Sequence, residues 1–131
     1  METIENQQLS AELQELYLEN KEWISQLQFL KDEHRFFSKL FEQQLLPGKP
    51  YSAAQASTIK NSLTLLYQKM EKLAQLTLAH KMLIEKALKD QEHQIGLELI
   101  EQNAAIAKEI KLLLSTDRLI KKDLFALVEE N

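Results

Sequence analysis

The sequence predicts an all-α protein: an up-down-up antiparallel three-helix bundle of long, coiled-coil-like helices whose faces suit association into a larger bundle. Only two Gly and two Pro occur in 131 residues, and three of these four lie together at 47–50. Good helix formers dominate the remaining chain, and apolar residues recur with a seven-residue period. One domain is therefore expected over 1–131, with helices at about 5–45, 52–89 and 92–129.

The first helix carries an apolar heptad seam that persists along most of its length. The two columns of this seam are Leu9, Leu16, Trp23, Leu30 and Phe37, and Leu13, Asn20, Leu27, His34 and Phe41. Flanking apolar residues widen the stripe, as suits a helix that packs against two neighbours; they are Tyr17, Ile24, Leu40 and Leu45. Pro47-Gly48-Lys49-Pro50 then ends the helix, because Pro lacks a donor and clashes with the preceding turn. The first turn is thus placed at 46–51.

The second helix begins at a capping box, with Ser52 as N-cap and Gln55 three residues later. Its seam columns are Ile59, Leu66, Leu73, His80 and Ala87, and Ala56, Leu63, Met70, Thr77 and Ile84. Beyond Ala87 the phase of the heptad changes. The next apolar row, Leu99, Ile106, Leu113, Ile120 and Leu127, indicates a third helix.

The second turn is predicted near 89–92. Lys86 and Lys89 suit the last turn of one helix, and Asp90, a candidate N-cap, suits the first turn of the next. Gly96 is the competing position for the turn, and one unbroken helix over 52–130 is the alternative to any turn. Within the third helix, Ser115-Thr116-Asp117 is a candidate kink.

The distribution of charge supports the antiparallel order of the helices and argues against two classes of partner. Residues 1–30 have a net charge of −5, residues 51–89 of +4 and residues 90–131 of −4, so a basic helix lies between two acidic ones. The overall charge of −4 argues against a nucleic-acid partner, and the mixed polar faces argue against a membrane surface. The chain has no Cys, no apolar leader and no bilayer-spanning run, so we expect a cytoplasmic protein.

Polar residues interrupt the seams and are predicted to form buried layers. A turn centred near 48–49 pairs Asn20 with Thr77, and a turn near 90 pairs Thr77 with Asn103. The same registers place His34, Leu63 and Asp117 in one layer. Such layers usually fix helix register, so Asn20→Leu should preserve the fold but loosen helix order or oligomeric state. The alternative for His34 and Asp117 is an acid/base or pH-sensitive pair.

The surroundings of the three histidines lack catalytic and metal-binding signatures. Position i−3 is Lys31 before His34, Thr77 before His80 and Asp90 before His93, so no Glu-x-x-His pair of a di-iron bundle exists. Phosphate-binding loops and nucleophile elbows are also missing from the sequence. We expect no catalytic residue, no metal site and no cofactor, and we interpret His93 as a solvated turn residue.

Apolar rows outside the seams carry the functional prediction. Phe29 and Phe36 on the first helix, with Leu112 and Leu119 on the third, form the candidate interface; Leu78 and Met82 also lie off the seam. Rows of exposed apolar residues mark a partner or self-association, unless they bury in a splayed core. The leading hypothesis is a non-enzymatic module that self-associates or docks a partner helix. The alternative is a small-ligand binder or enzyme with a buried pocket lined by His34, Asp117, His80 and Tyr17.

Overall fold

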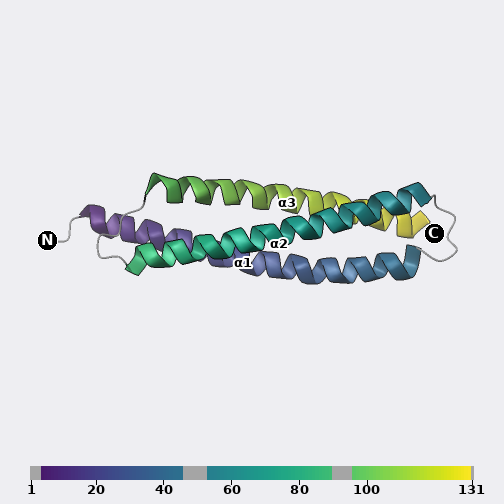
Figure 1. The fold of residues 1–131 in the computed structure, drawn as a ribbon, viewed down its shortest axis with the longest axis horizontal. Helices are drawn as coiled ribbons and strands as arrows, with labels where there is room; N and C mark the ends of the chain where they lie inside the picture. Colours follow the sequence, from purple (N-terminus) through teal and green to yellow (C-terminus); the bar gives the residue numbers. More distant parts are fainter. Residues whose placement is uncertain (1–3, 46–52, 90–95, 131) are drawn as a thin grey trace. The chain divides into compact units, whose positions relative to one another are not determined.

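The structure, a computed structural model, describes residues 4–45, 53–89 and 96–130. Three α-helices account for nearly all of them: α1 spans Ile4–Leu45, α2 spans Ala53–Lys89 and α3 spans Leu97–Glu130 (Figure 1). In these ranges the helices pack against one another and no strand occurs, which confirms the predicted fold class. None of the three helices is both long enough and apolar enough to pass through a bilayer.

The helix ends match the prediction at the first connection and differ at the second. α1 ends at Leu45 and α2 begins at Ala53, while the Pro47–Pro50 and Ser52 signals lie outside the described residues. α2 ends at Lys89, but α3 begins at Leu97, five residues later than predicted. Gly96, the competing position, directly precedes α3, and its carbonyl accepts from the amides of Leu99 (3.1 Å) and Ile100 (3.4 Å).

Two alternatives for the third segment are excluded. α2 and α3 are separate helices whose side chains meet, so residues 52–130 do not form one continuous helix. α3 continues through Ser115-Thr116-Asp117, where the Thr116 hydroxyl donates to the carbonyl of Leu112 at 2.9 Å. This hydrogen bond to the carbonyl four residues earlier satisfies the hydroxyl inside the helix, so the cluster does not split α3. Asp90 and His93 lie outside the described residues.

The chain divides into two compact units, each built from a part of every helix. Unit 1 comprises Met1–Leu27 and Leu73–Ile110, and unit 2 comprises Gln28–Lys72 and Lys111–Asn131. Contacts inside unit 2 show the order of the helices. α1 and α2 are antiparallel there, because His34 contacts Leu63 and Lys31 contacts Glu71.

The third helix of unit 2 runs parallel to the first. Lys121 on α3 pairs with Glu33 on α1, and Phe125 contacts Phe37 four residues further along both helices. The direction of α3 is therefore the same as that of α1 and opposite to that of α2. Unit 2 thus has the up-down-up topology that the short first connection and the charge pattern predicted.

Each unit has its own buried apolar core, drawn largely from the predicted seam columns. In unit 1 the core contains Leu13, Trp23, Leu27, Leu73, Ile84, Ile106 and Ile110. In unit 2 it contains Leu30, Phe41, Ile59, Leu63, Leu66, Met70, Leu113 and Leu124. The heptad therefore predicted correctly which side of each helix is buried.

Candidate functional site

The buried polar residues of unit 1 form a cluster centred on Asn103 of α3. Its Oδ1 lies 3.2 Å from His80 Nε2, and its Nδ2 donates to Glu19 Oε1 of α1 at 2.9 Å. Because an amide oxygen only accepts, His80 Nε2 carries the proton of this bond. Asn103 thereby links all three helices through one side chain.

The partner of Asn103 corrects the predicted register between α2 and α3. The sequence paired Asn103 with Thr77, but the structure pairs it with His80, about one helical turn away. The hydroxyl of Thr77 instead donates to the carbonyl of Leu73 in its own helix at 2.6 Å. The reason is that α3 begins later than predicted, at Leu97. The centre of the connection between α2 and α3 shifts accordingly, and so does the pairing of residues across these two helices.

Two polar groups in unit 1 are buried without partners. Asn20 is fully buried, and neither its Oδ1 nor its Nδ2 has a hydrogen-bond partner among the described residues. His80 is buried as well, and its Nδ1 is likewise unpartnered. A buried polar group without a partner costs about 1–3 kcal/mol, so these atoms oppose folding.

A groove lies beside this cluster, between α2 and α3 of unit 1, with a volume of about 280 Å³. We call it the α2–α3 groove. Most of its surface is apolar, and its lining includes Leu76, Ala79, Leu83, Ala105, Ile106 and Glu109. His80 also borders the groove, but its unpartnered Nδ1 is buried, so the groove presents mainly aliphatic surface.

His34 of unit 2 is held by backbone and hydroxyl groups rather than by a carboxylate. Its Nε2 donates to the carbonyl of Leu63 at 2.6 Å, and its Nδ1 lies 3.4 Å from Ser38 Oγ. The ring also lies 5.3 Å from the Tyr67 ring, centroid to centroid. The predicted contact with Leu63 is present, but Asp117 is paired with Lys121 and not with His34.

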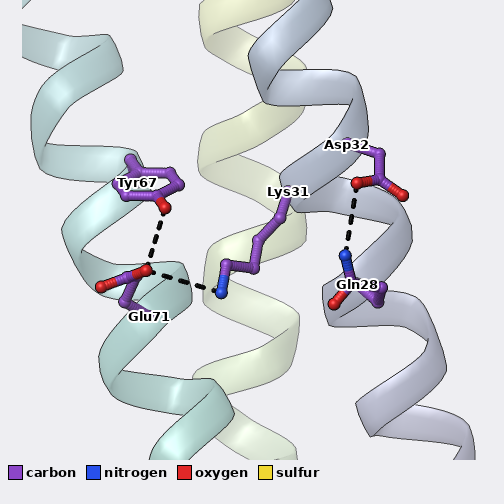
Figure 2. Close-up of polar contacts among 5 residues, drawn as sticks. All are labelled: Gln28, Lys31, Asp32, Tyr67 and Glu71. Atoms are coloured by element: carbon purple, nitrogen blue, oxygen red, sulfur yellow. Dashed lines mark hydrogen bonds and ion pairs between the residues drawn. The ribbon is translucent and has the colours of Figure 1, made fainter.

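A polar cluster that includes Tyr67 joins α1 and α2 in unit 2, as Figure 2 shows. The Tyr67 hydroxyl donates to Glu71 Oε1 at 2.9 Å, and Lys31 Nζ lies 3.6 Å from the same oxygen. On α1, Gln28 Nε2 donates to Asp32 Oδ1 at 3.2 Å. The hydrogen bond to Glu71, and then its negative charge, raises the pKa of Tyr67. These groups are largely exposed, so they contribute orientation more than stability.

Lys121 forms two short ion pairs in unit 2. Its Nζ lies 2.7 Å from Glu33 Oε1 on α1 and 2.8 Å from Asp117 Oδ2 on its own helix. Burial disfavours the ammonium, but hydrogen bonds to Asp117 and Glu33, with their charges, outweigh burial and raise the pKa of Lys121. Sequence reasoning missed this cation, although Lys121 follows Asp117 by four residues, a spacing that favours ion pairs in helices.

Alkaline pH should weaken unit 2 through Lys121. Because folding raises the pKa of Lys121, the stability of its pairs is full below the unfolded pKa of about 10.4 and is lost as pH rises through the folded pKa. We expect a fall in the free energy of unfolding above that pH that is smaller in Lys121→Met. Urea titrations in a Tyr67→Phe background check this, since the pKa of Tyr67 is also raised. Equal falls with and without Lys121 would contradict the assignment.

The four predicted interface residues all lie in unit 2, and all are exposed. The exposed fraction is 62% for Phe29, 63% for Phe36, 52% for Leu112 and 62% for Leu119. They are therefore not buried in a splayed core. Ala105 and Ala126, each seven residues from one of these leucines on α3, are exposed as well.

These four residues occupy more than one face of unit 2. The Phe36 ring lies 5.4 Å from the Phe37 ring, which lies 5.5 Å from Phe125 of α3. Leu119, by contrast, precedes Lys121, which faces α1, by two residues and so points about 200° away around the helix. The aromatic residues and the leucines therefore form two separate surfaces.

The residues predicted to line the alternative pocket fall in both units. Tyr17 and His80 belong to unit 1, whereas His34 and Asp117 belong to unit 2. Tyr17 is contacted by Lys21 and Lys81, whose ammonium groups lie 5.5 and 6.0 Å from its ring centroid. In the part of the chain that the structure describes, no group of three or more His, Cys, Asp or Glu residues is arranged to hold a metal ion.

Comparison of the chain with protein-family models, curated proteins and solved structures found no match. The fold and the site define a three-helix bundle with a linked polar cluster in unit 1 and exposed apolar surfaces in both units.

Proposed function

We propose that this chain is a cytoplasmic, non-enzymatic interaction module that associates through exposed apolar faces of its helices, with a second copy or with a helix of a partner protein. The observation that carries the proposal is the exposure of Phe29, Phe36, Leu112 and Leu119 in unit 2, each by more than half. Single exposed apolar residues are common on protein surfaces, but rows of them at helical spacing mark interaction surfaces.

The chemistry of the two surfaces suits the docking of a helix. Phe36, Phe37 and Phe125 form a chain of edge-to-face rings between α1 and α3, which offers rigid apolar area. Leu112 and Leu119 are one heptad apart on α3, a spacing that matches the apolar anchors of a partner helix. Each such side chain contributes about 1.5–3 kcal/mol when it is fully buried.

The double variant Phe36→Glu plus Leu112→Glu should abolish association through the unit 2 surfaces while the monomer keeps its fold, because both side chains are exposed. One charge is placed on each surface, and burial of either carboxylate in an interface is unfavourable. Native mass spectrometry measures the assembly mass, and pull-down with the tagged full chain measures partner recovery.

A matched control carries the same added charge at exposed polar positions of unit 2, as Asn61→Glu plus Ser115→Glu. This control should behave like the wild type in both measurements. If Phe36→Glu plus Leu112→Glu changed neither the assembly mass nor the recovery of any partner, the proposed function would be rejected.

A further inference from the structure

The α2–α3 groove of unit 1 has the shape of a receptor for helix side chains. Leu76 and Leu83 stand one heptad apart on α2, exposed by 49% and 47%, with Ala79 between them. Ala105 lines the groove from α3. Two small residues flanked by leucines form a hole of the kind that accepts a side-chain knob from a neighbouring helix.

The groove is also complementary to itself, since it supplies both parts of such packing. Leu76 and Leu83 can act as knobs, while Ala79 and Ala105 form the hole. A closed two-fold dimer requires this property, because the same patch must serve on both subunits.

The two helices beside the groove carry opposite net charges, which favours an occupant that carries both signs. The α2 part of unit 1, residues 73–89, has three Lys and one Glu and therefore a net charge of +2. The α3 part, residues 97–110, has three Glu and one Lys and therefore a net charge of −2. A helix of one sign is attracted to one of the two helices that border the groove and repelled by the other, whereas a second copy of this chain supplies both signs.

We propose that a second copy of this chain occupies the α2–α3 groove, with α2 of each copy against α3 of the other. This inference rests on the proposed function, for which it names the partner and a site in unit 1. A two-fold axis parallel to the helices places the basic helix of each copy against the acidic helix of the other. An axis across the helices places α2 against α2, so that like charges meet and oppose association.

The arrangement brings two small residues of different copies together. His80 pairs with Asn103, so Ala79 and Ala105 lie at nearby heights along the groove. A two-fold axis parallel to the helices preserves height, and Ala79 of one copy then lies nearest to Ala105 of the other. A two-fold axis across the helices instead brings Ala79 of one copy close to Ala79 of the other.

The first experiment is native mass spectrometry of the full chain over a range of concentrations. The wild type should appear at twice the subunit mass of 15.3 kDa. Leu76→Glu plus Leu83→Glu should raise the dissociation constant about a hundredfold, because two central apolar anchors become charged. The matched control, Leu78→Glu plus Met82→Glu, changes two exposed residues of the same helix that do not line the groove, and it should remain dimeric.

The second experiment determines which helices meet, and it exploits the lack of Cys in the chain. Ala79→Cys in unlabelled protein and Ala105→Cys in isotopically labelled protein are mixed and oxidised. A disulfide between position 79 of one copy and position 105 of the other should dominate over the two symmetric disulfides. Mass spectrometry of the cross-linked peptides identifies the product.

Three results would each overturn the inference: a monomeric wild type at every concentration, a dimer unaffected by the Leu76/Leu83 variant, or predominantly symmetric disulfides. The proposed function is decided separately. It would survive a monomeric wild type if Phe36→Glu plus Leu112→Glu abolished binding of a partner protein that the Asn61/Ser115 control retained.

Discussion

Asn20→Leu is expected to stabilise the protein, whereas Asn103→Leu is expected to destabilise it. Asn20 is fully buried in unit 1, and neither polar side-chain atom has a partner in the described part of the chain. Leu has a similar size and removes the cost of these two atoms. We expect the free energy of unfolding to rise by about 1–3 kcal/mol.

The same substitution at Asn103 should change the free energy of unfolding in the opposite direction, because both polar atoms of its amide have partners. Asn103→Leu removes the acceptor of His80 Nε2 and the donor to Glu19. His80 is buried and already has one unpartnered nitrogen, so the variant leaves its whole ring without a partner. We expect a loss of about 2–3 kcal/mol, since a bond to a charged group is lost as well.

Urea unfolding, with equal slopes in all variants, measures both changes. The gain in Asn20→Leu should come with looser helix order, detected as a less cooperative thermal transition or a mixture of assembly masses. The interpretation of Asn20 as a determinant of helix order fails if the mass and thermal cooperativity are unchanged. The interpretation of Asn20 as an unsatisfied polar group fails if the free energy of unfolding does not rise in Asn20→Leu.

Lys121→Met is expected to lower the stability of unit 2 by about 2 kcal/mol. Asp117 is buried, and removal of Lys121 leaves its carboxylate without that cation, while Glu33 loses its link to α3. Breaking a fully buried pair costs about 3–5 kcal/mol, and the partial exposure of Lys121 and Glu33 reduces the cost here.

Lys122→Met is the matched control, because it removes the same charge from the next residue, which is exposed. Its stability should stay within about 0.5 kcal/mol of the wild type. A second check is the double variant Lys121→Met plus Asp117→Leu, which removes both the cation and the buried carboxylate. It should recover much of the loss; if it does not, the loss comes from something other than an uncompensated carboxylate.

The sequence was enough to place the helices and their buried sides. Breakers at 47–50 and the change of heptad phase after Ala87 delimit three helices. The polar seam positions Asn20, Thr77 and Asn103 are buried in the structure, because side-chain direction in a helix follows residue spacing alone.

The sequence could not supply the register between α2 and α3 or the pairing of polar atoms. Moving the start of α3 to Leu97 brought Asn103 to His80 instead of Thr77. Asp117 paired with Lys121 on its own helix, although the heptad had placed it with His34. The spacing that favours this pair was visible, but many such pairs occur on helices and few are buried.

Sequence by itself therefore determined the fold class, the helix order and which side of each helix faces the core, because these follow from local periodicity and helix breakers. Only the tertiary structure decided which polar side chains meet, that Asn20 has no polar partner among the residues described, and that Phe36 and Leu119 lie on different surfaces. The physical reason is that periodicity sets the rotation of a helix about its axis but not its shift along a neighbour. A shift of one turn changes every interhelical hydrogen bond while the apolar seam stays buried.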